Sequence, residues 1–555
     1  MNEKEEYEKR LRRRLKILQE KMKEGKVIFN KDLNIKDSLS AVRMGSDGEI
    51  DLNTVDGVVR SLALAVTEMH DREELKKEAS LSEIQNTYFD FVERNFDWIY
   101  KIMKDKGMTP HDAGMVARKN KNTVTEITQN LNEFITIIKE FWSSTGEIAQ
   151  IHVQDMHENI KGVFGGDLFP SHNENIASKC GIYTDTIILP DPFLRSIHIF
   201  DKYSQEEKAY YFVKHAMNIL QYKELACANV DIPIVVVLPD FSAIEEDEEA
   251  FFRQLGMDDS IIHASKIFGH SFSSFEEMID FSNSLDTIDK TIKNIKDPQR
   301  VLFDTEWKGD LKSQIKRALS SDFMKPFGDI SPGFMLATQT LGRMSVSNEL
   351  LIKSRRLNGT PILDAPTSWK FLKWKMEYDA ERAEKIFNSK DLHVVQALTD
   401  LSNTDMHWLG NIPPEALIEI RKDGALDEIR NILGNGINEL IEMKPEDFQN
   451  SKKQVFENMN EAFKKHKENI SQLRAKKWKF VGKDIGTWIV VGSLEVAAAI
   501  TGTPVWGMAT IVADQVLDVP KLKDIPKSIK DLAAENSKIK KSPVGLLFDI
   551  KKKDT

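Results

Sequence analysis

The 555-residue sequence has little cysteine, with only Cys180 and Cys227. Two cysteines cannot build a disulfide framework, which excludes the small disulfide-rich secreted classes and fits a reducing cytoplasm. The N-terminus is charged from its third residue and lacks the apolar core that a signal peptide requires. These absences predict an intracellular, cytoplasmic protein.

Familiar catalytic and nucleotide-binding motifs are also missing. The chain has no GxxxxGK[ST], no GxGxxG after a predicted strand, no HExxH, no GxSxG and no paired CxxC. Its formal net charge of −10 argues against nucleic-acid binding over a broad surface. The sequence therefore specifies no reaction, and function has to be argued from weaker features.

The length predicts several domains, because 555 residues exceed what one hydrophobic core normally organises. A content of 41% hydrophobic and 30% charged residues is typical of globular proteins. We expect a mixed, predominantly α, multidomain fold. Its expected parts are a helical N-terminal region over 1–148, an α/β domain over 149–385, a helical region over 386–482, an apolar helical hairpin over 483–520 and a Lys-rich tail over 521–555.

The α/β domain is predicted from apolar runs of strand length that alternate with helical segments. The clearest runs are 183–189 and 232–238. The second is apolar throughout and mostly β-branched, as in strands buried on both faces of a parallel sheet. Capping patterns at Thr109-Pro110 and at Ser204 predict two helix starts. The weaker strand candidates are 260–268, 301–303 and 360–363.

The stretch Asp484–Pro520 contains no lysine or arginine, although basic residues flank both of its ends. Gly502 and Pro504 divide it into two apolar arms, because glycine and proline interrupt a helix. Such a hairpin fits entry into a membrane from its positive side. The arms would be about 24 and 20 Å long as helices, too short to cross a hydrocarbon core of about 30 Å.

Two alternatives remain for this hairpin. It is buried within the protein or a homo-oligomer, or it inserts into a membrane, which would place the protein at the periphery of a bacterial inner membrane. Glycines would permit close helix contacts in either case. If the whole stretch crossed a membrane as one helix kinked at Pro504, Glu495 would lie near mid-membrane at a cost of about 2.5 kcal/mol or more. The candidate interface residues are Trp488, Gly492, Glu495, Gly502, Pro504, Trp506 and Gly507.

Two predicted strands end in the same way, at Pro190-Asp191 and Pro239-Asp240. Carboxylates at neighbouring strand ends could hold Mg²⁺, with Asp185 or the cluster at 304–306 as a third ligand. Such a metal could activate water for phosphodiester cleavage. The alternative is that each Pro-Asp pair ends a strand and caps the next helix or turn.

A small basic patch, Lys353, Arg355 and Arg356, precedes Asn358-Gly359. It is a candidate anion-binding site, and the alternative is a solvated helix end.

Two functions from different classes are therefore expected. The first is a non-enzymatic intracellular effector or interaction protein whose hairpin mediates oligomerisation or membrane perturbation. A bacterial stress or phage-defence setting would suit that architecture. The second is a metal-dependent phosphoesterase or nuclease, with Mg²⁺ at the strand ends.

Overall fold

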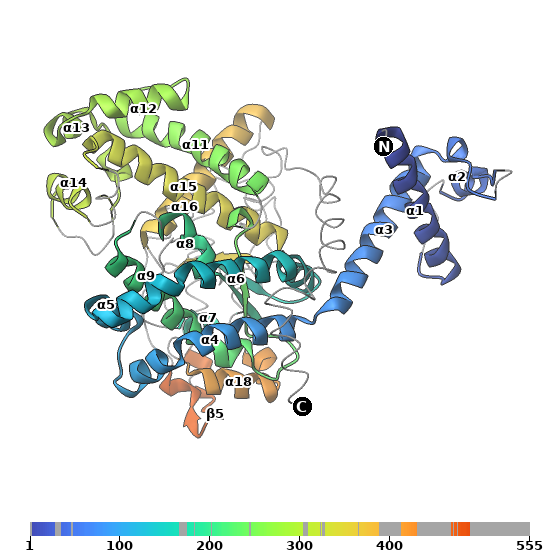
Figure 1. Cartoon of the computed structure of the whole chain (residues 1–555), viewed down its shortest axis with the longest axis horizontal. Helices are drawn as coiled ribbons and strands as arrows, with labels where there is room; N and C mark the ends of the chain where they lie inside the picture. Colours follow the sequence, from blue (N-terminus) through green and yellow to red (C-terminus); the bar gives the residue numbers. More distant parts are fainter. Residues whose placement is uncertain are drawn as a thin grey trace. The chain divides into compact units, whose positions relative to one another are not determined.

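The computed structural model shows a mostly helical chain with a small parallel sheet (Figure 1). It divides into two compact units, Met1–Leu81 and Ser82–Thr555. The structure describes residues 3–27, 35–45, 48–165, 175–182, 184–200, 203–243, 246–303, 309–321, 324, 328–363, 366–387, 412–429, 468–469, 471–473 and 475–488. Helical and α/β character, as predicted, are confirmed.

The N-terminal unit is built from two long helices with a modest apolar core. The Asp56 carboxylate accepts a hydrogen bond from the Val59 amide and so begins the second long helix. Ion pairs from Arg13 to Asp71 and from Lys21 to Glu73 join the two helices. The elements are α1 (Glu3–Lys23), α2 (Ile35–Ala41), η1 (Leu52–Thr54) and α3 (Gly57–Glu78).

Three helices begin the second unit: α4 (Leu81–Asp105), α5 (Pro110–Lys119) and α6 (Lys121–Gln154). Helix α5 begins after Thr109, as predicted, and Thr109 forms a capping box with Asp112 there. Because α6 runs through position 148, the helical region expected over 1–148 has no boundary there. Its second half packs with the α/β elements instead.

The sheet has four parallel strands in the order β3-β2-β1-β4. Their bounds are β1 (Lys161–Phe164), β2 (Thr186–Pro190), β3 (Val235–Leu238) and β4 (Thr360–Ile362). Three of them, β2, β3 and β4, overlap predicted runs, and the predicted parallel pairing is confirmed. Strand β1 was not predicted. The candidates at 260–268 and 301–303 were wrong, because the first is helical and the second forms no strand.

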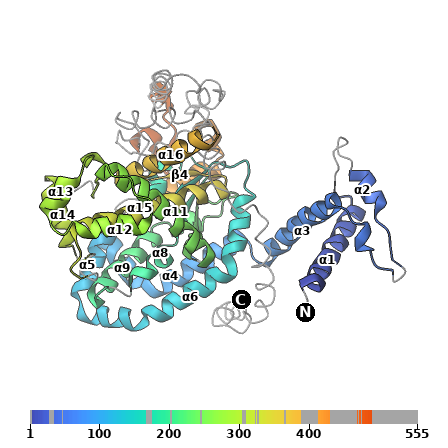
Figure 2. The ribbon, with the colours of Figure 1, turned by 90° about the horizontal axis from the view of Figure 1, so that it is seen from above.

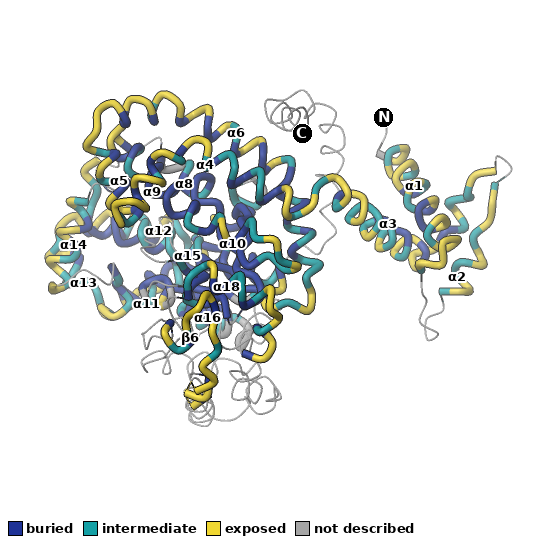
Figure 3. The backbone as a smooth tube through the Cα atoms, turned by 90° about the horizontal axis from the view of Figure 1, so that it is seen from below, coloured by how far each residue is buried: buried dark blue, intermediate teal, exposed yellow. Residues whose placement is uncertain are grey.

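Helices enclose this sheet. In Figure 2, α4, α5, α6, α8 and α9 lie together below, and α11 to α16 lie above them. Helix α15 packs against β1 and β4, whereas α6 packs against β3. Most of the buried backbone lies inside this unit (Figure 3). The remaining bounds are α7 (Ile176–Cys180), α8 (Pro192–Phe200), α9 (Gln205–Leu220), α10 (Lys223–Ala226), η2 (Phe241–Ala243), α11 (Glu246–Phe268), α12 (Phe275–Ser284), α13 (Ile288–Asn294), η3 (Pro298–Arg300), α14 (Leu311–Leu319), α15 (Pro332–Arg356) and α16 (Pro366–Phe387).

A glutamine covers the edge of the sheet at β3. The Gln85 side chain on α4 accepts a hydrogen bond from the Val237 amide at 2.7 Å and donates one to the Val237 carbonyl at 3.0 Å. Gln85 is 1% exposed. A side-chain amide therefore satisfies backbone groups that a further strand would otherwise pair.

A buried lysine joins the sheet to the end of α6. Lys161, the first residue of β1, donates through its Nζ to the carbonyls of Val153 and Met156 at 3.1 and 3.0 Å. Burial lowers the pKa of Lys161. The amine satisfies carbonyls at the C-terminus of a 34-residue helix, where such groups lack helical partners.

The described C-terminal elements pack near the amino end of β2. They are α18 (Pro414–Lys422), the antiparallel pair β5 (Lys479–Phe480) and β6 (Lys483–Asp484), and η6 (Ile485–Thr487). Arg421 on α18 donates to the carbonyls of Gly181 and Thr184. The described part of the region predicted to be helical up to 482 thus ends in a short β-ribbon.

The predicted hairpin begins at this ribbon. Ile485 and Trp488 are buried, and the Ile485 amide donates to the Trp478 carbonyl. The other interface candidates, Gly492, Glu495, Gly502, Pro504, Trp506 and Gly507, lie outside the described residues, as does the Lys-rich tail. In the described part of the chain, no helix combines the length and apolarity needed to cross a membrane.

Candidate functional site

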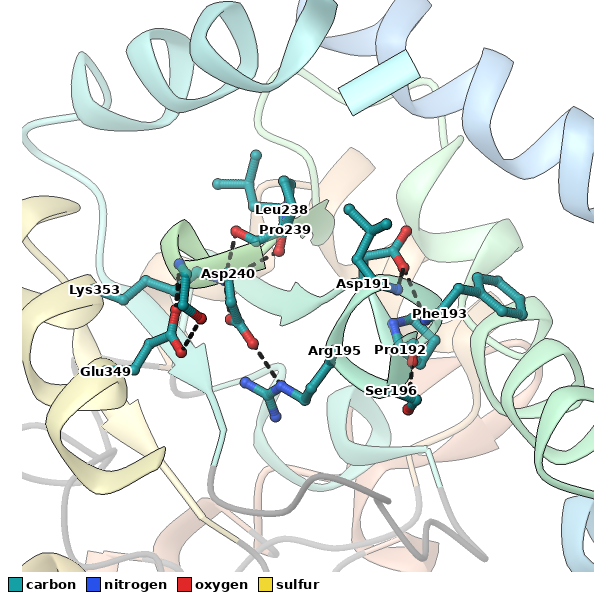
Figure 4. A network of polar contacts seen from close by, with 12 residues as sticks. Asp191, Pro192, Phe193, Arg195, Ser196, Leu238, Pro239, Asp240, Glu349 and Lys353 are labelled. Carbon is teal, nitrogen blue, oxygen red and sulfur yellow. Dashed lines mark hydrogen bonds and ion pairs between the residues drawn. The ribbon is translucent and has the colours of Figure 1, made fainter. Parts of the chain in front are cut away.

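The candidate site lies at the carboxyl edge of the sheet, beyond β2 and β3. Parallel α/β sheets bind ligands at this edge. Strand pairing places Pro190 beside Leu238, so the predicted aspartates Asp191 and Asp240 leave neighbouring strands. The structure thus brings these two residues to one edge, as the sequence predicted, and Figure 4 shows where their side chains point.

Asp191 caps a helix. One carboxylate oxygen accepts the amides of Phe193 and Leu194 at 2.8 and 2.9 Å, and the other accepts the Trp142 indole N–H at 2.8 Å. Asp191 is 1% exposed, and burial raises the pKa of its carboxyl against the lowering effect of these donors. With Pro192 as the first helical residue, this is the capping alternative foreseen for the Pro-Asp pair.

Asp240 sits between two cations. Its carboxylate lies 2.5 Å from the Nε atom of Arg195 and 2.9 Å from the Nζ atom of Lys353. Burial alone would raise the pKa of Asp240, but the two positive charges outweigh it and hold the pKa well below its ordinary value. Lys353 also donates to the carbonyls of Leu238 and Pro239 at 3.0 and 3.1 Å.

A second carboxylate lies beside this ion pair. Glu349, one turn before Lys353 on α15, accepts hydrogen bonds from the amide and hydroxyl of Ser242 at 3.1 and 2.7 Å. Burial, and then the negative charge of Asp240, raise the pKa of Glu349 to about 7. The two bonds fasten η2 to α15.

Asp185 lies at the opposite end of β2. It precedes the strand, accepts the Ile160 amide at 2.7 Å and pairs with Arg421 at 3.5 Å. The three predicted metal ligands are therefore not brought together, because five strand residues separate Asp185 from Asp191. The alternative third ligands at 304–306 lie outside the described residues. Within the described ranges, no group of three or more His, Cys, Asp or Glu side chains could hold a metal ion.

The predicted basic patch does not form one anion site. Lys353 is buried against the end of β3, whereas Arg356 pairs with Glu248 at 3.0 Å and stacks over the Phe241 ring. Burial lowers the pKa of Arg355, and the charge of Arg356 adds to that effect. The three side chains therefore serve different contacts.

The strand order reverses between β1 and β4, which pair directly. A Cβ atom at Gly165, directly after β1, would lie 2.7 Å from the Leu350 side chain of α15. Leu350 is itself buried. Doubly wound folds bind ligands at this reversal, and here an apolar side chain of α15 lies directly against the glycine.

Sequence reasoning missed Arg195, Ser242 and Glu349. Arg195 lies one turn after Asp191. This spacing indicates that the two residues share a helix face, but it does not indicate that Arg195 pairs with Asp240. It also missed a buried cluster between α11, α15 and α16. There Asp259 and Asp379 pair with Lys375 and Arg382, and the Asn348 amide donates to Asp259 at 2.7 Å. Two acids and two bases balance, as expected for a structural ion cluster.

Comparison with known proteins adds no identity: no family model, no curated protein and no solved structure matches this chain. The geometry of the site alone bears on function.

The network makes a pH-dependent prediction through Glu349. Because its folded pKa lies above the unfolded value, the folded chain holds a proton that the unfolded chain has already lost between about pH 4.5 and pH 7. Stability is therefore lost as pH rises through this window. The Glu349→Gln variant keeps an acceptor for Ser242 without the charge, so its melting temperature should exceed the wild-type value increasingly from pH 5 to pH 8.

Thermal melts of both proteins across this range check the prediction. The comparison with Glu349→Gln is needed because Asp240, with its lowered pKa, adds stability that is lost only in acid. A difference in melting temperature between the two proteins that stays constant with pH would contradict the raised pKa of Glu349.

Proposed function

We propose that this chain is a non-enzymatic interaction protein in which the α/β unit is a rigid scaffold and residues 484–520 mediate self-association or membrane perturbation. The observation that carries the proposal is the burial of the two aspartates at the carboxyl edge of the sheet. Asp191 and Asp240, two of the metal ligands predicted from the sequence, are 1% and 3% exposed and held by protein donors. Such a network supports shape rather than turnover.

The start of the apolar stretch supports the second half of the proposal. Ile485 is fully buried and Trp488 is 8% exposed, so the chain enters the stretch from packed positions. Glu419 of α18 accepts the Val481 amide at 2.5 Å and holds the preceding ribbon. Movement of the stretch would thus be linked to α18 and the sheet. A bacterial stress or phage-defence setting is part of this proposal.

A metal-dependent phosphoesterase would need Asp191 or Asp240 to exchange its protein partners for a cation. Mg²⁺ requires several accessible oxygen ligands in octahedral geometry. Among the described residues of this edge, no contact favours the exchange, so we do not propose this function.

The test compares the full chain with a variant lacking 489–520, which keeps Ile485 and Trp488. Sedimentation measures the oligomer, and dye release from vesicles of phosphatidylethanolamine and phosphatidylglycerol measures membrane perturbation. We expect the deletion to abolish at least one of these activities. A variant lacking the tail 521–555, of similar length, is the control and should keep both. If the 489–520 deletion folds and changes neither property, the proposal fails.

A further inference from the structure

The lysine ribbon, residues 476–484, contains strands β5 and β6 and a cluster of exposed cations. The exposed lysines are Lys476, Lys477, Lys479 and Lys483. Lys476 pairs with Glu428 at 3.6 Å, and no ion pair joins the other three lysines to another residue that the structure describes. The segment contains one acid, Asp484, so its net charge is +3. The ribbon is therefore a compact positive surface.

The tip of the ribbon holds an exposed valine in a strained backbone conformation. Val481 and Gly482 form the two-residue turn between the strands, with φ angles of 49° and 72°. Two positive φ angles are typical of a type I′ turn, which favours Asn-Gly, because a β-branched residue is disfavoured in this backbone region. Val481 is 49% exposed, so packing within the chain does little to offset the strain. An exposed residue held in strain indicates a role in contact with a partner.

The ribbon is held in place although its tip is exposed. Phe480 is 4% exposed, and β5 packs against α18. The Glu419 carboxylate accepts the amide of Val481 itself, and the Trp478 carbonyl accepts the Ile485 amide. The lysines and the valine are thus presented on a fixed scaffold, which lowers the entropic cost of binding a partner.

We infer that the lysine ribbon binds an anionic phospholipid surface, with the lysines at the phosphates and Val481 at the boundary between headgroups and acyl chains. Basic residues beside a membrane-active segment bind anionic headgroups, and each contributes about a fivefold factor in affinity. The inference rests on the proposed function and deepens it, because the apolar stretch begins at Asp484, within the ribbon. It names the surface that this stretch meets.

A nucleic acid also carries phosphates, but the ribbon is less suited to it. Sequence readout and base stacking use arginine, asparagine or exposed aromatic side chains. The ribbon exposes lysine and valine instead, and Trp478 is half-buried with the Lys476 amine over its ring. An apolar tip gains nothing from a phosphate backbone, whereas a lipid interface removes it from water. The valine therefore favours lipid.

A charge variant of the full chain tests the lysines. Lys477→Gln, Lys479→Gln and Lys483→Gln are combined, and flotation measures binding to phosphatidylcholine vesicles with and without phosphatidylglycerol. We expect wild-type protein to bind only the vesicles that contain phosphatidylglycerol, and the variant to bind them about a hundredfold more weakly.

The matched control removes the same charge elsewhere. It combines Lys106→Gln, Lys119→Gln and Lys121→Gln, three exposed lysines near the termini of α4, α5 and α6, and should bind the vesicles as wild type does. Equal losses in the two variants would show that only net charge matters and would overturn the inference. Wild-type protein that prefers single-stranded or duplex DNA to the anionic vesicles would also overturn it.

The valine gives a second test in which binding and stability respond differently. Asparagine suits the left-handed backbone of the turn, so Val481→Asn should not lower the melting temperature. The same variant should bind the anionic vesicles severalfold more weakly, because the apolar tip is lost. A lower melting temperature would mean that Val481 packs within the chain, and unchanged binding would mean that the tip does not meet lipid. Either result contradicts the role of Val481.

Vesicle binding is measured apart from the two properties that test the proposed function. If the lysine variant binds anionic vesicles as wild type does, while deletion of 489–520 abolishes dye release or self-association, the inference is wrong and the proposed function stands. If the deletion changes neither property while the lysine variant loses vesicle binding, the proposed function fails and the ribbon is still a lipid-binding surface.

Discussion

Replacing Lys353 with methionine should destabilise the second unit by about 3–5 kcal/mol, the range for breaking one partner out of a buried ion pair. Lys353 is 2% exposed, and its amine has three acceptors: the Asp240 carboxylate and the carbonyls of Leu238 and Pro239. Methionine fills similar space but donates to none of them. Asp240 would keep only Arg195, and the end of β3 would lose its cap.

Lys101→Met is the matched control. Lys101 contacts Asp97 at 2.6 Å, closer than Lys353 contacts Asp240, but the Lys101 and Asp97 side chains are 69% and 41% exposed. Water screens such a pair, so its loss should leave the stability of the protein nearly unchanged. Urea titration followed by circular dichroism measures both variants. Equal midpoint shifts would show that burial does not set the strength of the Lys353 network.

Replacing Gln85 with leucine should cost roughly 2–6 kcal/mol, because two buried backbone groups of Val237 each lose a partner at about 1–3 kcal/mol. Leucine keeps the apolar volume and the helix propensity of the position. The loss therefore comes from the unpaired amide and carbonyl at the edge of β3.

Asn95→Leu on the same helix is its control. The exposed Asn95 amide donates only to the Phe91 carbonyl of its own helix. Its replacement should leave the urea midpoint nearly unchanged. A small effect at both positions would mean that β3 relaxes to satisfy its own backbone.

Local signals accounted for much of the fold. Pro110 in the first turn and the Ser204 cap predicted two helix starts, because these signals depend only on residues close together in sequence. The strand ending at Leu238 was predicted by its β-branched residues. The run 260–268 misled because a short apolar run has no decisive period. It continues a helix that begins at Glu246.

Strand β1 escaped prediction for a different reason. Its four residues, KGVF, begin with lysine and include glycine, so the pattern does not indicate a buried strand. All four are buried. The Lys161 amine reaches the end of α6, and α15 packs against the strand. Those contacts are made across the fold, and no window of sequence contains them.

At the candidate site, too, the sequence predicted local features but not the contacts made between distant parts of the chain. Position after a strand predicted that Asp191 and Asp240 share an edge. It did not predict that Arg195 and Lys353 would pair with Asp240, or that Glu349 would lie beside that pair. Glu349 and Lys353 are on α15, which begins more than 90 residues after Asp240 in the chain. The sequence placed the acids, and tertiary packing determined their partners.

The buried amine of Lys161 can serve as a probe of local opening of the fold. While the chain is folded, this amine is 1% exposed and engaged with two carbonyls, so acylating reagents cannot reach it. Surface lysines such as Lys290 react at once by comparison, since that side chain is 48% exposed. The rate at which Lys161 is labelled, measured by mass spectrometry, therefore reports how often the contact between α6 and β1 opens.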